Sequence, residues 1–207
     1  MLVCLDIEGT LLPELWGKIA EATGIAALRI TTRDEPDYHA LMAARIRSLN
    51  EHGLSIERLV SIVREVELLP GAREFLDEVR ARWPTLLVSD SYRDFLGPLA
   101  AKLGCAPAIC HRLTLDVAGR VTGWAARLDD QKPKVVRAMQ DLGYSVFAAG
   151  DSFNDIGMLK AADAARFINV PELIAAAHPE IGVCRDYHEL FDAMSTLARR
   201  CGLREFE

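Results

Sequence analysis

Two acidic residues, Asp6 and Glu8, follow directly after an apolar run at residues 2–5. This run is too short for a helix and is apolar at every position, which is typical of a strand covered on both faces, as in a parallel sheet. Ligands of open α/β sheets bind outside the carboxyl ends of the strands, because loops and helix amino termini gather there. The sequence therefore predicts an acid pair at a ligand crevice, although a plain turn that closes a strand has the same pattern.

Two later apolar runs also end in polar groups. The predicted strand 85–89 ends in Ser89, and the predicted strand 145–149 leads into Asp151. Carboxylates from separate strands that meet at one edge of a sheet repel one another unless a cation lies between them. Because oxygen donors alone favour Mg²⁺ over softer metals, we expect Asp6 and Asp151 to be ligands of Mg²⁺.

A phosphate compound is the expected ligand of this site. Bound Mg²⁺ keeps positions for waters and for a substrate phosphate. Ser89, placed before a predicted helix, could donate to a phosphate oxygen together with backbone N–H groups, and Lys132 could add compensating positive charge. Taken singly, Ser89 is more often a cap and Lys132 a solvated surface residue, but their combination with the acids favours a phosphate site.

Composition narrows the class of protein. The chain has 207 residues, of which 50% are hydrophobic, so it can form one α/β domain with a modest insertion. A net charge of -6 argues against nucleic acid or an anionic membrane surface as the main partner. The five cysteines lack metal-type spacing, and the chain opens into a strand without a leader or a long apolar run. We therefore expect reduced thiols and a cytoplasmic protein.

The order of the elements predicts two parts. Three helical patterns separate the first predicted strand from the second, whereas a β-α-β crossover needs only one helix. They cover about residues 13–24, 38–50 and 55–66. We expect residues 13–67 to form a small helical cap over a core made of residues 1–12 and 68–207.

Strands and helices alternate from residue 70 onward, which predicts an α/β fold with a doubly wound parallel, Rossmann-like sheet and the cap inserted after its first strand. The predicted helices are 72–81, 93–103, 132–142, 154–161 and 188–200. The predicted strands are 85–89, 145–149 and 165–168, with a hairpin at 113–124.

The polar segments resemble, in order and spacing, the four motifs of the haloacid dehalogenase-like phosphohydrolases. The matching segments are Asp6-Ile7-Glu8-Gly9-Thr10, Ser89, Lys132 and Gly150-Asp151-Ser152-Phe153-Asn154-Asp155. The helical insertion is similar to the cap of the phosphoserine phosphatase branch. Further segments resemble the bifunctional phosphoserine phosphatase/homoserine phosphotransferase group. They are Asp6 to Gly9, Thr31-Thr32-Arg33-Asp34 through Tyr38, Glu51-His52-Gly53-Leu54 and Ser89-Asp90.

This resemblance implies a Mg²⁺-dependent phosphatase that hydrolyses O-phospho-L-serine in serine biosynthesis, with phosphoryl transfer to homoserine as a second activity. Asp6 would attack phosphorus and carry an aspartyl-phosphate. Glu8 would protonate the leaving oxygen and then activate water, and its main-chain carbonyl would join Asp6 and Asp151 as a Mg²⁺ ligand. Asp155 would orient waters on the metal.

Phosphate and substrate contacts are implied in the same way. Ser89, Lys132 and Asn154 would surround the phosphate, and Asp90 would line the pocket. The chain departs from the usual family pattern at two places: Glu8 replaces the common Asp, and Asp90-Ser91 replaces a common glycine pair. The longer Glu8 acid could favour transfer to an alcohol over transfer to water.

The cap is expected to choose the substrate. Arg45 lies on or beside the apolar stripe of its predicted helix, where it could simply extend its head group into water. The resemblance favours a bidentate clamp on the substrate carboxylate instead. Glu14 matches the residue that receives the substrate ammonium in the family. We interpret His111 and Trp124 as structural residues.

Two alternatives stay open at this point. A phosphatase for another small phosphomonoester would keep the core and differ in the cap. A signalling receiver also uses a strand-end Asp, a Lys and Mg²⁺, but it needs neither a cap nor the acid/base Glu8. The sequence leaves the oligomeric state open, with a homodimer as one option.

Overall fold

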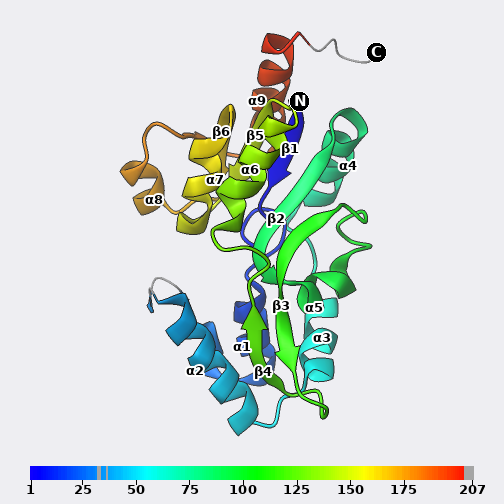
Figure 1. The fold of residues 1–207 in the computed structure, drawn as a ribbon, viewed down its shortest axis with the longest axis vertical. Helices are drawn as coiled ribbons and strands as arrows, with labels where there is room; N and C mark the ends of the chain where they lie inside the picture. Colours follow the sequence, from blue (N-terminus) through cyan, green and yellow to red (C-terminus); the bar gives the residue numbers. More distant parts are fainter. Residues whose placement is uncertain (32–33, 36, 203–207) are drawn as a thin grey trace.

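The computed structural model describes residues 1–31, 34, 35 and 37–202 (Figure 1). In this part of the chain one sheet has seven strands in the order β4-β3-β2-β1-β5-β6-β7. Its central strand, β1 (Leu2–Leu5), is parallel to both neighbours. Leu2 and Cys4 pack into one hydrophobic cluster, and Val3 and Leu5 pack into another. Both faces of β1 are therefore covered, as the continuous apolar run predicts.

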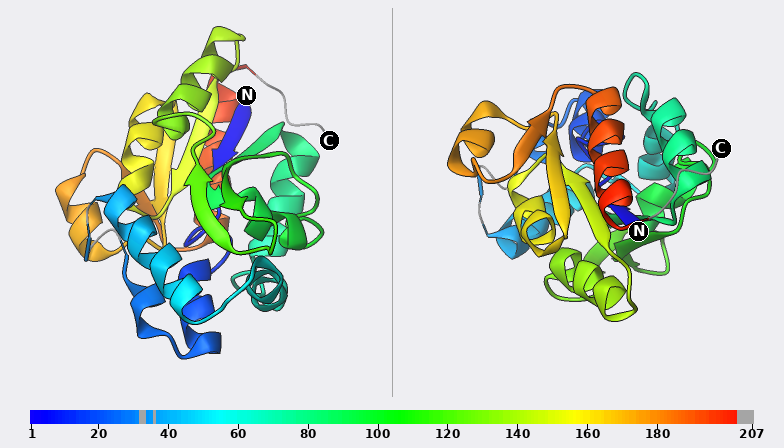
Figure 2. Two further views of the ribbon diagram at one scale, coloured as in Figure 1. Left: turned by 60° about the horizontal axis from the view of Figure 1, so that its bottom comes forward. Right: turned by 90° about the horizontal axis from the view of Figure 1, so that it is seen from above.

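The remaining elements form an α/β fold, as predicted. The other strands are β2 (Thr85–Tyr92), β3 (Ala108–Leu115), β4 (Val121–Ala125), β5 (Val146–Gly150), β6 (Ala164–Ile168) and β7 (Gly182–Cys184). Pairing is parallel except between β3 and β4, which form the predicted hairpin. Helices lie on both sides of the sheet (Figure 2). They include α4 (Ala72–Arg82), α6 (Gln131–Asp141), α7 (Ile156–Ala161) and α9 (Tyr187–Arg200).

Further helices connect β1 to α4 and lie beyond the carboxyl end of β1 (Figure 1). They are α1 (Leu15–Thr23), the 3₁₀ turn η1 (Ala26–Arg29), α2 (Tyr38–Glu51) and α3 (Ile56–Arg64). The β3–β4 hairpin reaches these helices. The N–H of Ile56 donates to the carbonyl of Gly119 at 2.9 Å, and the Asn50 side chain donates to the carbonyl of Val121 at 3.1 Å.

The prediction for the second strand was wrong at its end. Residues Ser89, Asp90 and Ser91 are typical of a turn, yet β2 continues to Tyr92, which pairs with His111 of β3 after an irregularity in register. Tyr92 is buried, and its hydroxyl lies 2.6 Å from the hydroxyl of Tyr38. These tertiary contacts outweigh the local turn preference.

Other differences also have local causes. The predicted helix 93–103 is replaced by α5 (Arg93–Leu96) and the 3₁₀ turn η2 (Gly97–Leu99), because Pro98 cannot continue an α-helix. The sequence patterns also miss α8 (Glu172–Ala177), β7 and η1, which are all short. Thr32 and Arg33, from the segment similar to the bifunctional group, lie outside the described residues.

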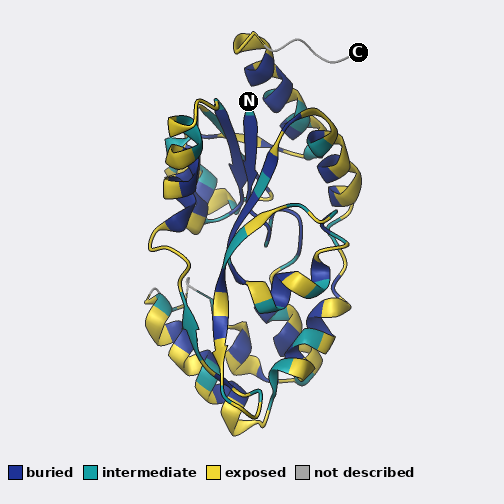
Figure 3. Cartoon of the chain, turned by 45° about the vertical axis from the view of Figure 1, so that its right-hand side comes forward, coloured by how far each residue is buried: buried dark blue, intermediate teal, exposed yellow. Residues whose placement is uncertain are grey.

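Burial follows this architecture. Figure 3 shows β1 and β5 buried at the centre, with exposed positions on the outer faces of the helices. Within the described ranges, no helix is both long and apolar enough to cross a membrane.

Candidate active site

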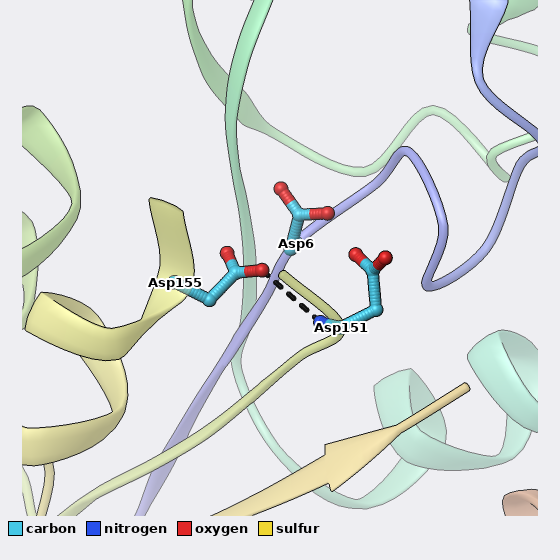
Figure 4. Close-up of side chains that lie close together, drawn as sticks. All are labelled: Asp6, Asp151 and Asp155. Atoms are coloured by element: carbon cyan, nitrogen blue, oxygen red, sulfur yellow. Dashed lines mark hydrogen bonds between the residues drawn. The ribbon is translucent and has the colours of Figure 1, made fainter. Parts of the chain in front are cut away.

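Three aspartates meet at the carboxyl ends of β1 and β5 (Figure 4). One carboxylate oxygen from each of Asp6, Asp151 and Asp155 lies within 4.8 Å of the others, and all three residues are buried. The strand pairing places them there: Leu5 pairs with Ala149, and the N–H of Asp6 donates to the carbonyl of Ala149 at 3.0 Å. Each strand therefore ends at the same level and delivers one acid.

Two glycines make room for these acids. A Cβ on Gly9, where φ is +80°, would lie 2.2 Å from Asp151 Oδ2. A Cβ on Gly150 would lie 2.3 Å from Asp155 Cγ. Both carboxylates therefore occupy space that any other residue at positions 9 and 150 would fill.

Asp155 is fixed by several donors. Its Oδ2 accepts from the N–H of Asp151 at 3.0 Å, shown in Figure 4, and from the N–H and Oγ of Ser152, both at 2.9 Å. Its Oδ1 accepts from Lys132 Nζ at 2.7 Å. These hydrogen bonds hold Asp155 as a rigid support of the cluster.

Lys132 at the start of α6 is the buried cation of the site. Its Nζ lies 2.7 Å from Asp6 Oδ1, 2.7 Å from Asp155 Oδ1 and 3.6 Å from Asp90 Oδ2. Burial alone lowers the pKa of Lys132, but the charges of Asp155, Asp6 and Asp90 outweigh it and raise that pKa well above its usual range. Lys132 therefore carries its charge at neutral pH.

The acids outnumber this cation. Burial, together with the charge of Asp155, raises the pKa of Asp6 well above its usual range. Burial, followed by Asp155 and Glu14, raises the pKa of Asp151 to about 8. Asp151 Oδ1 is buried without a hydrogen-bond partner. An unpaired buried carboxylate oxygen in an all-oxygen donor set fits a hard divalent cation.

Ser89 contacts Gln131, the neighbour of Lys132 in sequence, and Asn154 shares a cavity with Lys132. Ser89 is buried, and its Oγ accepts from the N–H of Ser91 at 3.1 Å within β2 rather than at a helix amino terminus. Asn154 is exposed in the 3₁₀ turn η3 (Phe153–Asp155) and lines the same cavity as Lys132.

Glu8 is half-buried and faces the first turn of α1. Its Oε2 accepts from the N–H of Leu15 at 2.8 Å. Burial and the charge of Glu14 raise the pKa of Glu8 to about 7, although hydrogen bonds from Ser91 and Leu15 act against this shift. A carboxyl group with this pKa can give and take a proton near neutral pH. Glu14 itself is exposed.

Arg45 is buried, so its head group does not extend into water. Its guanidinium carbon lies 4.7 Å from the centre of the Trp16 ring, and its Nη2 donates to the carbonyl of Ile30 at 2.6 Å. Its Nε has no hydrogen-bond partner. Helical spacing alone could not predict this burial, because the partners come from α1 and from the segment after η1.

A cavity of about 430 Å³ lies beside Lys132. Its lining includes Asp90, His111 and Gln131, and Gln131 Nε2 donates to the Ser89 carbonyl at 2.7 Å and to Asp90 Oδ1 at 3.2 Å. Sequence reasoning missed Gln131 and gave His111 only a structural role. No sequence signal pairs His111 with Asp90, because the irregular register of β2 and β3 brings them together.

Comparisons with known proteins agree with this geometry. A family model described as haloacid dehalogenase-like hydrolase matches residues 2–160. Phosphoserine phosphatase ThrH of Pseudomonas aeruginosa is 41% identical over 189 residues, covering 91% of this chain and 92% of that protein. A phosphoserine phosphatase of Pseudomonas syringae pv. tomato is also 41% identical over 189 residues, covering 91% and 80%.

Solved structures share the fold. One is described as a phospho-aspartyl intermediate analogue of phosphoserine phosphatase, with a TM-score of 0.76 and 21% identity, covering 92% of this chain and 97% of that one. A substrate-bound phosphoserine phosphatase complex has a TM-score of 0.75 and 20% identity, covering 92% and 96%. The family match, together with the strand-end acids, leads to one conclusion: the chain belongs to the haloacid dehalogenase-like hydrolases.

Proposed function

We propose that this protein is a Mg²⁺-dependent phosphatase that hydrolyses O-phospho-L-serine to serine and phosphate, and that it also transfers the phosphoryl group to homoserine. The observation that carries the proposal is the buried Asp6, 2.7 Å from Lys132 and grouped with Asp151, one of whose oxygens has no hydrogen-bond partner. The relatives at 41% identity, both named phosphoserine phosphatases, support the choice of substrate.

The first half-reaction uses Asp6 as the nucleophile. A carboxylate oxygen of Asp6 forms a bond to phosphorus while the bond from phosphorus to the serine oxygen breaks. Glu8, with its pKa of about 7, donates a proton to that leaving oxygen. Lys132 holds Asp6 in place and offsets negative charge on the phosphoryl oxygens.

The second half-reaction restores Asp6. Water gives its proton to Glu8 and bonds to phosphorus, and the bond from phosphorus to Asp6 breaks. When homoserine takes the place of water, its hydroxyl gives up the proton in the same way. The proposed roles of Ser89 and Asn154 are to hold the phosphate, together with Lys132.

Asp6, Asp151 and the main-chain carbonyl of Glu8 are the proposed Mg²⁺ ligands, and Asp155 supports them. The unpartnered Asp151 Oδ1 favours this assignment. When bound, Mg²⁺ supplies charge neutralisation at the phosphoryl oxygens. Without it, burial and then the charge of Asp155 raise the pKa of both Asp6 and Asp151.

We further propose that residues 13–67 act as a cap that recognises the amino acid, over a core of residues 1–12 and 68–207. Arg45 would bind the substrate carboxylate, and its unpartnered buried Nε supports an anionic ligand there. Glu14 would bind the ammonium group. The proposed binding partner is therefore a small phosphoamino acid, and the proposed location of the protein is the cytoplasm.

One assay tests the function. Phosphate release from O-phospho-L-serine is measured with Mg²⁺, with and without homoserine, while O-phosphohomoserine is followed by NMR. We expect phosphate in both cases and phosphohomoserine only when homoserine is present. If a panel of other small phosphomonoesters is turned over faster than phosphoserine, the substrate assignment is wrong. An aspartyl-phosphate that persists far beyond seconds would instead indicate a signalling receiver.

A further inference from the structure

His111 on β3 is a buried histidine outside the proposed chemistry. Its Nδ1 accepts a hydrogen bond from the N–H of Arg127 at 3.2 Å. Burial lowers the pKa of His111 below its usual range, although Asp90 acts in the opposite direction. A neutral ring whose Nδ1 accepts a hydrogen bond must carry its proton on Nε2. This N–H therefore faces Asp90 Oδ1, 3.6 Å away.

Asp90 lies between this histidine and Lys132. Its Oδ2 is 3.6 Å from Lys132 Nζ, and its Oδ1 accepts from Gln131 Nε2 at 3.2 Å. Its side chain is 30% exposed, facing the cavity beside Lys132. The Gln131 amide orientation is settled because its nitrogen faces two acceptors, Asp90 and the Ser89 carbonyl. Gln131 thus donates the hydrogen bond to Asp90, while His111 Nε2 and Lys132 Nζ lie at equal distances of 3.6 Å from its two carboxylate oxygens.

We propose that Asp90 and His111 form a positioning pair that sets how strongly Lys132 attracts the phosphoryl group. The negative charge of Asp90 offsets part of the positive charge of Lys132, and the N–H of His111, 3.6 Å from Asp90 Oδ1, attracts the carboxylate away from that lysine. The inference rests on the proposed function, because it takes Lys132 as a phosphate-binding group.

The geometry predicts that Asp90 and His111 have opposite effects on phosphate binding at Lys132. Asp6 and Asp155 already lie 2.7 Å from Lys132, so a third carboxylate competes with any phosphoryl oxygen for the same ammonium group. Removing the charge of Asp90 should release that competition. Removing the donor of His111 should leave Asp90 less restrained and increase the competition.

The test measures binding of inorganic phosphate by isothermal titration calorimetry, with Mg²⁺ present, at a pH where His111 is neutral. Asp90→Asn should bind phosphate roughly three- to tenfold more tightly, the size expected for one partly screened charge at a few ångströms. His111→Phe should bind it about two- to threefold more weakly. His111→Gln keeps an N–H donor and should restore binding to near the unmodified value.

The double variant Asp90→Asn/His111→Phe gives the decisive result. If His111 acts through Asp90, the double variant should bind phosphate like Asp90→Asn alone. Asp130→Asn is the matched control, because Asp130 is an exposed acid on the same cavity and its left-handed backbone suits Asn. It should change the phosphate Kd by less than about twofold, since its charge is screened by solvent.

Two outcomes would overturn the inference: weaker binding in both single variants, or absence of phosphate binding by the unmodified protein. Weaker binding in both would mean a merely structural role. Circular dichroism separates either result from unfolding. The proposed substrate is tested separately by turnover. If phosphoserine is not hydrolysed but the two variants still shift phosphate binding in opposite directions, the proposed function fails and the positioning pair stands.

Discussion

The strand-end cluster differs from Arg45 and Glu14, two residues of the segment after β1, in how the side chains are held. Asp6, Asp155 and Lys132 are buried and joined by hydrogen bonds of 2.7 Å, with partners supplied by neighbouring core elements. Arg45 and Glu14 have no such network. Arg45 rests on Trp16 and on the Ile30 carbonyl, and Glu14 is exposed.

This difference matches the two roles proposed for these groups: the reaction for the strand-end cluster, and substrate recognition for Arg45 and Glu14. The core presents Asp6, the proposed nucleophile, and Lys132 in fixed positions, which suits a step that depends on alignment. Arg45 and Glu14, the residues proposed to recognise the amino acid, keep an unpartnered and a solvated polar group, which suits binding of a ligand that brings its own charges. Changes in the core should therefore affect turnover, whereas changes in the helical part should affect substrate affinity.

The largest effect is expected for Asp6→Asn. An amide cannot form the aspartyl-phosphate, so phosphate release should fall by at least about a thousandfold. Mass spectrometry of the acid-quenched protein should detect a phosphoryl adduct only in the unmodified chain. Substantial residual turnover in a correctly folded variant would remove the covalent route.

Arg45→Ala should raise the KM for phosphoserine by roughly ten- to a hundredfold, the size of a lost charged hydrogen-bond pair. Phosphoethanolamine lacks the carboxylate, so its KM should change far less. Arg47→Ala, an exposed arginine on the same helix, is the control and should leave both KM values unchanged. Equal changes for the two substrates would exclude a carboxylate clamp.

Removal of the metal should make stability depend on pH. The pKa of Asp151 is about 8 in the folded protein, far above that of an unfolded Asp, so the metal-free fold loses stability as pH rises toward 8. The slope from one proton is at most about 1.4 kcal/mol per pH unit. Urea unfolding at pH 6 and pH 8.5, in EDTA or in Mg²⁺, measures it.

Asp151→Asn is the matched variant for this measurement. It should remove both the pH dependence attributed to Asp151 and the stabilisation by Mg²⁺. If Mg²⁺ stabilises this variant as much as the unmodified chain, Asp151 is not a metal ligand.

The smallest effect concerns the contact between the two regions. The Tyr38 hydroxyl on α2 lies 2.6 Å from the Tyr92 hydroxyl on β2, and the Tyr38 hydroxyl donates to the Asp90 carbonyl at 3.4 Å. Tyr38→Phe should lower the free energy of unfolding by about 1 kcal/mol. Tyr144→Phe, at an exposed tyrosine, should have no measurable effect. A loss above about 3 kcal/mol would show that the two regions are joined more firmly than these bonds indicate.

The sequence was most informative where one segment determines its own environment. The apolar run before Asp6 predicted a strand covered on both faces, and the helical pattern at residues 13–24 corresponds to α1 at Leu15–Thr23. The sequence was least informative where contacts with distant segments determine the local structure or the burial of a residue. Polar Ser89–Ser91 resembles a turn, but pairing with β3 extends the strand through it. The burial of Arg45 likewise depends on Trp16 and Ile30, which its own helix cannot reveal.

The sequence also predicted which acids lie together, but it did not predict the hydrogen-bond partners of each carboxylate. Motif spacing brought Asp6, Asp151 and Asp155 to one site. It could not show that Asp155 is saturated by donors while Asp151 keeps a bare oxygen, because that depends on the turn after Gly150. The pairing of His111 with Asp90 was equally hidden.

The two glycines beside the aspartates constrain the order in which this site could change over evolution. Alanine at position 150 would collide with Asp155, and any side chain at position 9 would collide with Asp151. Such replacements become tolerable only after the neighbouring acid has been lost or moved, so each glycine and its acid should vary together among relatives. A chain that retains both acids but has lost either glycine would need a rebuilt strand end.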